Sequence, residues 1–376
     1  MSQLHVAVIG TGFWGRNQAR VLSQLSQTKL VCVCDVNPSA ASSVGSQFNV
    51  EYTSDVDDVL SRSDIDAVTV CTPTITHRDV ATRVLMSGKH VMVEKPMTNT
   101  VTEAQELLSL AQERKLRIMP GHIERFNPAV THLKSLVDRG QLGKVILLLA
   151  RRVGRWPERI GDVGVVRDTA IHDIDLARYF FGEEVSAVYA QIGTMRHTKE
   201  DYAEIMLQFA GGGTAFIDAN WLTPRKTRTL VVTGSEATAQ LDYITQQLSI
   251  ENSTRTTIQN IERKEPLAAE LAHFAESIRS NRPFSVSAMD GLKAVEICEA
   301  VLKSGEAGRT LTLSANSALR SSSAATRFSA SGTPSAIILA ARARAASIFS
   351  SSSANDDSAK YAKATTLSGR ISTTPP

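Results

Sequence analysis

The sequence predicts an α/β plus α+β protein, in which a doubly wound parallel sheet is followed by a mostly antiparallel sheet. Two observations support this prediction. In the first third of the chain, short apolar runs alternate with helical stretches, which is typical of β-α-β units with right-handed crossovers. After about residue 122, long strand candidates follow one another instead. We therefore predict one domain at residues 1–121, a second at 122–314 and a separate tail at 315–376.

The first domain contains six candidate strands and five candidate helices. The run "LHVAVIG" has no polar alternation, as expected of a strand that is buried on both faces of a sheet. Similar strands are predicted at residues 28–37, 50–55, 65–74, 90–96 and 116–122. Helices are predicted between them at residues 11–25, 38–49, 56–64, 76–89 and 98–115.

The second domain is predicted to begin with a helix that ends near Gly140. Strand candidates follow at residues 144–154, 185–195, 201–222 and 228–243, and "GGG" at 211–213 resembles a hairpin turn. A helix at 168–182 interrupts them. Two late amphipathic helices are predicted at 266–281 and 288–305, and a last short strand at 309–313.

Composition and charge exclude several classes of protein. No apolar run approaches the roughly 20 residues of a membrane span, and the start of the chain lacks a basic-then-apolar signal segment. Four scattered cysteines indicate a reducing cytoplasm. Cys32 and Cys34 form a CxC without a second pair at ligand spacing, so we predict buried thiols and no metal.

The net charge of +3 arises in the tail. Residues 315–376 hold seven of the 41 Lys/Arg and two of the 38 Asp/Glu, which leaves 34 and 36 in the rest. The body is therefore near neutral, and we predict no nucleic-acid partner. The tail is rich in Ser and Ala, which predicts disorder. A partner-binding arm and a terminus altered by a reading-frame change are the alternatives.

A glycine pattern follows the first strand directly. Gly10, Gly12 and Gly15 form GxGxxG and open a helix, and Asp35 lies 20 residues beyond Gly15 at the end of the second strand. In a Rossmann fold the glycines permit the turn, the approach of a pyrophosphate and close helix packing, and the acid binds the adenosine ribose. A 2′-phosphate would be repelled by Asp35. The pattern predicts NAD, and a doubly wound fold without nucleotide is the alternative.

Two further strands end in residues that suit a cofactor site. Thr72 and Pro73 end the strand that begins at Ile65, on the edge where open α/β sheets bind ligands. An ordinary loop is the alternative. The next strand ends in "EKP", which places Lys95 beside the expected nicotinamide. A lysine there could stabilise negative charge on a substrate oxygen while hydride leaves the adjacent carbon.

The stretch "DTAIHDID" offers a proton acceptor. Asp168 and His172 are four residues apart, so they share a face of a helix, and Asp175 follows three residues later. A histidine near a carboxylate suits general base catalysis near neutral pH. A metal pair without an evident third ligand and a solvated helix surface are the alternatives.

Taken together, "VIGTGFWG", "VCTPTITH", "VEKPMT" and "DTAIHDID" resemble the Gfo/Idh/MocA oxidoreductases, in the order of that family and over about residues 3–313. The resemblance implies that Lys95, Asp168 and His172 are the catalytic residues. It also implies a homo-oligomer, a dimer or tetramer, that forms through the sheet face. "GHIERFNPAV", "RIGDVGVVRDTAIHDIDLARYFFG" and "NWLTPRKTRTLVVTG" are similar to the branch of UDP-N-acetylglucosamine 3-dehydrogenases.

We therefore predict two sets of binding residues. Those for NAD are Gly10, Gly12, Phe13, Trp14, Gly15, Asp35, Thr72, Pro73, His77, Glu94 and Lys95. Those for a UDP-sugar are Arg125, Asn127, Arg152, Arg159, Asp168, His172 and Trp221. Arginine can bind a diphosphate bidentately, although a solvated basic loop would also contain Arg151, Arg152, Arg155 and Arg159. Trp221 could stack on a base or belong to the core.

The predicted reaction is NAD-dependent oxidation of the C3 hydroxyl of a UDP-N-acetylhexosamine, UDP-N-acetylglucosamine, to the 3-keto sugar. The resemblance places this step before an aminotransferase that makes a 3-amino sugar. Two alternatives stay open: a dehydrogenase of another sugar or polyol such as inositol, and a catalytically silent NAD-binding regulator.

Overall fold

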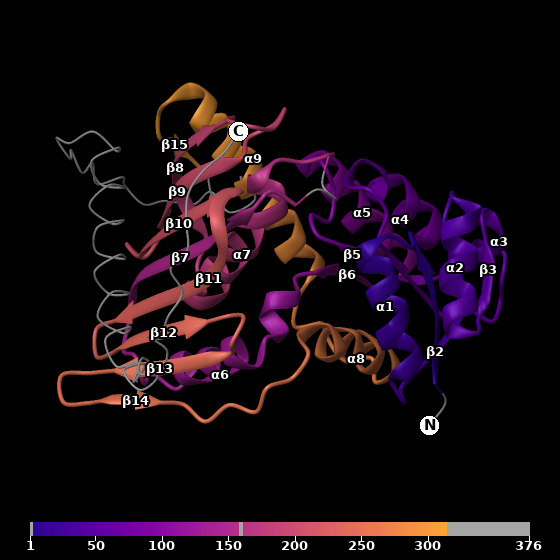
Figure 1. Ribbon diagram of the computed structural model, residues 1–376, viewed down its shortest axis with the longest axis horizontal. Helices are drawn as coiled ribbons and strands as arrows, with labels where there is room; N and C mark the ends of the chain where they lie inside the picture. The colour runs from indigo at the N-terminus through magenta and orange to yellow at the C-terminus, as the bar shows by residue number, and fades with distance from the viewer. Residues whose placement is uncertain (1–2, 158–160, 314–376) are drawn as a thin grey trace, which may run out of the picture.

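The computed structural model describes residues 3–157 and 161–313, so the tail and Arg159 lie outside the described residues. Two sheets make up the described chain. A six-stranded sheet with its helices forms one half of the molecule and a nine-stranded sheet the other, as Figure 1 shows. The predicted fold class, a Rossmann domain followed by a mostly antiparallel sheet, is confirmed.

The first sheet has the strand order β3-β2-β1-β4-β5-β6, and all of its pairs are parallel. The order reverses between β1 and β4, and the edge of the sheet at this switch point is where doubly wound folds bind ligands. Its strands are β1 (Leu4–Ile9), β2 (Thr28–Cys34), β3 (Glu51–Thr53), β4 (Ala67–Val70), β5 (His90–Glu94) and β6 (Ile118–Gly121).

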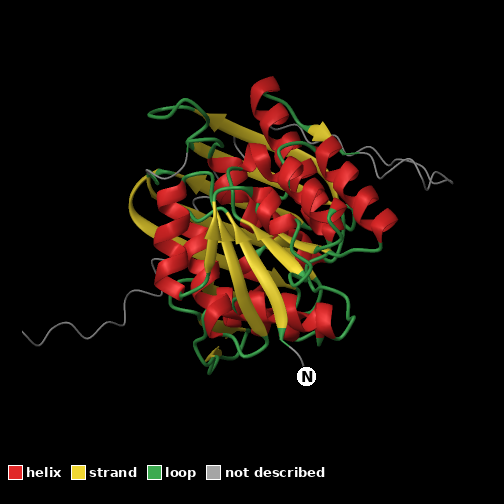
Figure 2. Cartoon of the chain, turned by 90° about the vertical axis from the view of Figure 1, so that its right-hand side faces the viewer, coloured by secondary structure: helices red, strands yellow, loops and turns green. Residues whose placement is uncertain are grey.

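Helices cover both faces of this sheet (Figure 2). They are α1 (Phe13–Gln24), α2 (Pro38–Phe48), α3 (Val56–Leu60), α4 (His77–Met86) and α5 (Val101–Arg114), and the short 3₁₀ helix η1 (Thr74–Thr76) precedes α4. Local sequence fixes several of their starts. Asn37 caps α2 by accepting from two backbone N–H groups, and Thr100 with Glu103 forms a capping box on α5.

A late helix completes the core of the first sheet. Helix α8 (Pro266–Arg279) packs against α1, and its buried Leu271 and Phe274 join the apolar cluster that contains Val6 and Leu22. Apolar residues at three- and four-residue spacing give α8 the single face that this contact needs. The chain therefore returns from the second sheet to the first before it ends.

The second sheet has the order β14-β13-β12-β11-β7-β10-β9-β8-β15, and only β7 and β10 pair in parallel. The sequence did not predict β13 and β14, which are short and largely polar. Its strands are β7 (Val145–Arg155), β8 (Val185–Gly193), β9 (Tyr202–Phe209), β10 (Thr214–Asn220), β11 (Leu222–Gly234), β12 (Thr238–Asp242), β13 (Gln247–Glu251), β14 (Thr256–Ile258) and β15 (Leu311–Thr312).

Helices α7 and α9 pack against one another and against this sheet. Helix α9 also packs against α5 and β6, which places it between the two halves of the molecule (Figure 1). No helix in the described ranges is long and apolar enough to cross a membrane. The remaining elements are η2 (Ile123–Phe126), α6 (Pro128–Asp138), the π-helical turn η3 (Val166–Ala170), α7 (Ile171–Phe181) and α9 (Ala288–Ala307).

Candidate active site

A glycine turn between β1 and α1 forms the first wall of the site. Gly10 has a φ of +91°, which favours glycine. A Cβ on Gly15 would lie 1.7 Å from the Gly10 carbonyl oxygen, so this position must be glycine for the turn and the helix to pack. A Cβ on Gly12 would meet nothing within 4 Å. The open space at Gly12, in front of the amino-terminal N–H groups of α1, is what a pyrophosphate requires.

Asp35 closes the turn from the end of β2. Its Oδ2 accepts hydrogen bonds from the Thr11 backbone N–H at 2.7 Å and from Thr11 Oγ1 at 3.0 Å. Its Oδ1 accepts from the Asn37 N–H at 2.9 Å. A carboxylate has about four acceptor positions, so Asp35 is oriented by the chain and can still accept from ribose hydroxyls.

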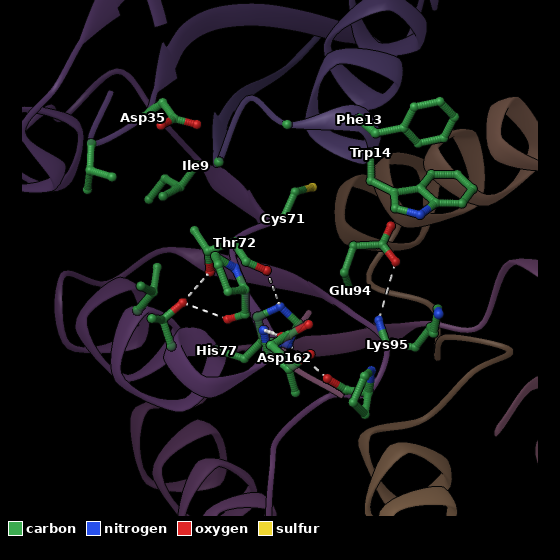
Figure 3. A pocket seen from close by; sticks show the side chains of 18 of the residues that line it. Ile9, Phe13, Trp14, Asp35, Cys71, Thr72, His77, Glu94, Lys95 and Asp162 are labelled. Atoms are coloured by element: carbon green, nitrogen blue, oxygen red, sulfur yellow. Dashed lines mark hydrogen bonds between the residues drawn. The ribbon is translucent and has the colours of Figure 1, made fainter. Parts of the chain in front are cut away.

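A cavity of about 590 Å³ runs along the carboxyl edge of the parallel sheet. Figure 3 shows Asp35 at one end of it and Lys95 at the other. Ten of the eleven residues predicted to bind NAD line this cavity, and only Gly15 does not. Gly15 acts on the site indirectly, through the packing of the turn. The glycine cradle, the oriented Asp35 and the volume of the cavity fit a dinucleotide.

Lys95 joins the two halves of the molecule at the far end of the cavity. Its Nζ donates to the Asp168 backbone carbonyl at 2.6 Å and to Asp168 Oδ1 at 2.9 Å. The side chains of Lys95 and Asp168 are 7% and 12% exposed, so little water screens the pair. Lys95 follows the last residue of β5, whereas Asp168 lies in η3, a π-helical turn of a kind that is common at functional sites.

His172 lies on the first turn of α7, just beyond Asp168. His172 is half-buried as a whole residue, and its ring Nδ1 is enclosed and has no hydrogen-bond partner among the described residues. Burial, and then the charge of Lys95, lower the pKa of His172 well below its ordinary value. The imidazole is therefore neutral at neutral pH and can take up a proton.

The described chain matches family models over most of its length. Residues 4–122 match the oxidoreductase family with an NAD-binding Rossmann fold, and residues 130–240 match the Gfo/Idh/MocA carboxyl-terminal domain. The chain belongs to the Gfo/Idh/MocA oxidoreductase family. It is therefore an oxidoreductase, and NAD, which accepts hydride when bound, is its cofactor.

Curated relatives and solved structures of this family match this chain over nearly their whole length. The UDP-N-acetylglucosamine 3-dehydrogenase of Acidithiobacillus ferrooxidans is 30% identical over 78% of this chain and 95% of its own. An inositol 2-dehydrogenase of Rhizobium meliloti is 28% identical over 81% of this chain and 98% of its own. The crystal structure of the Acidithiobacillus ferrooxidans enzyme superposes with a TM-score of 0.76 and covers 82% of this chain and 99% of its own.

Among the described residues predicted to bind substrate in this Gfo/Idh/MocA protein, only Asp168 lines the cavity, and Arg125, Asn127, Arg152, His172 and Trp221 do not. The first three are held by partners elsewhere. Arg152 is 1% exposed and donates to Asp173 and Glu124, with the shortest contact at 2.7 Å. Arg125 is similarly enclosed by Asp175 and Asp290. Asn127 caps α6 and donates to the Tyr243 carbonyl.

These contacts give the three residues architectural positions, and their binding of substrate stays a prediction. Trp221 is buried as well, but it lies beside η3, where its Nε1 donates to Thr169 Oγ1 at 2.9 Å.

The sequence patterns missed two residues that the fold brings to the site. Asp162 lines the cavity and accepts a hydrogen bond from the Thr74 N–H at 2.8 Å, so a loop of the second domain holds the start of η1. Arg228 on β11 is 37% exposed, and its charge contributes to the lowered pKa of His172. Only the register of β11 against β7, which pairs Arg228 with Arg152, places it there.

His77 connects two loops at the Lys95 end of the cavity. Its ring nitrogens lie 2.8 Å from the Pro96 carbonyl and 2.8 Å from the Thr72 carbonyl (Figure 3). The ring therefore ties the end of β4 to the loop that follows Lys95. No group of three His, Cys, Asp or Glu side chains among residues 3–157 and 161–313 could hold a metal ion.

Proposed function

We propose that this protein oxidises the C3 hydroxyl of a UDP-N-acetylhexosamine, with UDP-N-acetylglucosamine as substrate, to the 3-keto sugar. The single observation that carries the chemistry is the Lys95–Asp168 pair at the end of the cofactor cavity, with the neutral His172 one helical turn away. The product ketone is the kind of compound that an aminotransferase converts into a 3-amino sugar.

His172, Lys95 and Asp168 each have a separate role in the proposed reaction. His172 takes the hydroxyl proton, because its lowered pKa leaves the ring nitrogen unprotonated. Lys95 stands where negative charge develops on the substrate oxygen, and its ammonium group stabilises that charge. Asp168 holds Lys95 in place through the contact at 2.9 Å. NAD, when bound, would accept the C3 hydrogen as hydride, so that oxidation of the carbon is balanced by reduction of the cofactor.

Two observations support a nucleotide-linked substrate. The 3-dehydrogenase of Acidithiobacillus ferrooxidans, named for UDP-N-acetylglucosamine, matches this chain over 95% of its length. Arg228 offers a partly exposed cation near His172, and the nearest acid, Glu124, is 3.8 Å from it. Glu124 already receives a hydrogen bond from Arg152 at 2.7 Å, so Arg228 keeps capacity for an anion.

A second candidate function is the oxidation of a cyclic polyol such as inositol. The observation in its favour is the sequence identity to inositol 2-dehydrogenases. At 28% it is nearly as high as the 30% identity to the UDP-N-acetylglucosamine 3-dehydrogenase. A polyol has no phosphate, so it would use Lys95, Asp168 and His172 and would not need Arg228.

The test is NADH formation at 340 nm with UDP-N-acetylglucosamine, N-acetylglucosamine and myo-inositol, each with NAD and with NADP. A coupled aminotransferase removes the ketone, because alcohol oxidation can be thermodynamically uphill. We expect turnover only with the combination of UDP-N-acetylglucosamine and NAD, and none with the other two substrates or with NADP. Lys95→Ala and His172→Ala should retain NAD binding and lose about 10²-fold or more in rate. Turnover of myo-inositol alone, or normal rates in both variants, would overturn the proposal.

We also propose a cytoplasmic homo-oligomer, dimer or tetramer. The four cysteines are all free in the described chain, which suits a reducing compartment. The second sheet carries helices on one face, and its other face is the surface we propose for the contact between subunits. Light scattering on the purified protein would report the mass, and a monomeric mass at micromolar concentration would refute this.

A further inference from the structure

Three aromatic rings form a cluster beside η3, the turn that contains Asp168. The centroids of Trp156 and Trp221 lie 4.9 Å apart, edge to face, and those of Trp156 and His197 lie 3.9 Å apart. Trp221 is 5% exposed, whereas Trp156 and His197 are half-buried and keep part of their ring surface open. We call Trp156, His197 and Trp221 the aromatic wall.

Hydrogen bonds connect this wall to the catalytic carboxylate. Trp221 Nε1 donates to Thr169 Oγ1 at 2.9 Å, and Thr169 Oγ1 donates to Asp168 Oδ2 at 3.1 Å. The indole of Trp221 is thus two hydrogen bonds from the residue that orients Lys95. Trp156 is the next ring outward, so it is placed to contact a substituent of the reacting sugar.

The wall is built before any ligand arrives, because a buried carboxylate fixes its loop. Asp201, with 0% exposure, accepts from the backbone N–H groups of Met195, Arg196 and His197 at 2.6–3.2 Å. The Asp201 carbonyl accepts from the Trp221 N–H at 2.9 Å. One residue therefore positions both His197 and Trp221. Burying a carboxylate is costly unless it is fully hydrogen-bonded, and these contacts satisfy it.

The same loop presents positive charge. Arg196 and Lys199 are exposed on either side of His197. Glu200, the acidic residue that follows Lys199, is half-buried and accepts a hydrogen bond from the Val166 N–H at 3.3 Å. An aromatic surface flanked by cations suits a nucleotide better than a second sugar, because a sugar carries no phosphate.

We propose that the aromatic wall is the nucleotide subsite of the substrate pocket: Trp156 stacks on the nucleobase, His197 packs against the indole of Trp156, and Arg196 and Lys199 attract the diphosphate. This proposal rests on the proposed function, since it assumes a nucleoside-diphosphate sugar. A base stacked on an aromatic side chain contributes about 1–3 kcal/mol. Trp221, which has little open surface, supports Trp156 and holds it relative to Asp168.

The test uses the full-length, NAD-loaded protein and titrates it with uridine and with UDP. Trp156→Ala should weaken the binding of both ligands by about 5- to 150-fold. It should raise the KM for UDP-N-acetylglucosamine to a similar extent and leave kcat and NAD affinity within about twofold. Trp156→Phe should restore most of the affinity. Met195→Ala, on the same loop but 70% exposed and without a ring, is the matched control and should bind normally.

A second variant separates charge from stacking. Arg196→Gln with Lys199→Gln should weaken the binding of UDP and leave that of uridine unchanged. Unaltered UDP affinity in Trp156→Ala, together with normal oxidation of the UDP-sugar, would overturn the subsite and leave the proposed function intact. If the UDP-sugar is not oxidised, the titration decides alone: UDP binding that Trp156→Ala abolishes supports the subsite, and no binding by the wild type overturns it.

Discussion

Replacing Arg152 distinguishes a structural from a substrate-binding role for this residue. Arg152 is enclosed and pairs with two carboxylates, Glu124 at 2.7 Å and Asp173 at 2.8 Å. Its guanidinium also lies 4.6 Å from the ring centroid of Tyr243. Arg152→Met keeps an unbranched apolar stem that reaches about as far as Nε, and it removes the guanidinium group and its charge. The carboxylate of Asp173, with 0% exposure, would then keep the hydrogen bond from the Tyr243 hydroxyl at 3.0 Å and lose both of those from the guanidinium.

The expected loss is large, because one arginine offsets two buried negative charges. Breaking a buried ion pair by removing one partner costs about 3–5 kcal/mol. At about 2–4 °C per kcal/mol, Tm should fall by roughly 6–20 °C. Arg151→Met is the matched control on the opposite face of β7. Its side chain is 46% exposed and pairs with Asp218, so the change should cost about 0–1 kcal/mol.

Thermal unfolding followed by circular dichroism measures both variants, and a double-mutant cycle with Asp173→Asn measures the coupling. The double variant should lose less than the sum of the two single changes, because it removes a charge together with its partner. If Arg152→Met melts within about 2 °C of the wild type and instead raises the KM for the UDP-sugar, the guanidinium binds substrate and the structural reasoning is wrong.

Three further predictions concern the site and the core. The profile of kcat/KM against pH should lack a limb near the ordinary imidazole pKa of about 6.5, because burial and Lys95 lower the pKa of His172 and the ring is neutral above that lowered value; a limb at 6.5 or above would contradict this. Burial, with the charges of Glu94 and Glu124, raises the pKa of the Glu270 carboxyl well above its ordinary value. Its stabilising effect is full below the unfolded pKa of about 4.3 and is lost as pH rises through the folded pKa. Glu270→Gln should therefore melt like the wild type in acid and at a higher temperature than the wild type in alkali, where only the wild type must bury a charged carboxylate; equal melting at all pH values would refute the raised pKa. Gly15→Ala should lower Tm or prevent folding, because its Cβ would collide with the Gly10 carbonyl, whereas Gly12→Ala should fold normally and lose NAD affinity in a calorimetric titration. Normal NAD binding by Gly12→Ala would show that the pyrophosphate does not bind at this turn.

Much of the parallel sheet could be predicted because the patterns that indicate its strands and helices each lie within a short stretch of the sequence. Apolar runs, helical spacing and GxGxxG each occupy a few neighbouring residues, and β-α-β handedness then places every strand end on one edge. That is why Asp35 and Lys95, 60 positions apart, were predicted to lie in one site, and both line the cavity. Strands β13 and β14 were missed because short polar runs carry no clear period.

The substrate side could not be predicted in the same way, because it depends on register. Arg151 and Arg152 are neighbours, so one must face the helices and the other the open face of the sheet, and composition alone does not say which. The pairing of β11 with β7 places Arg228 opposite Arg152. Asp162 reaches Thr74 across 88 positions, in a contact that no local pattern encodes.

The measurement that tests the central claim most directly is the fate of a deuterium at C3 of UDP-N-acetylglucosamine. The deuterated sugar is incubated with NAD and the purified protein, and the nicotinamide cofactor is recovered and analysed by mass spectrometry. The proposed chemistry predicts a reduced cofactor that carries the deuterium, and its loss in His172→Ala and Lys95→Ala. A reduced cofactor without deuterium, or no reduction at all, would contradict oxidation at C3 by this site.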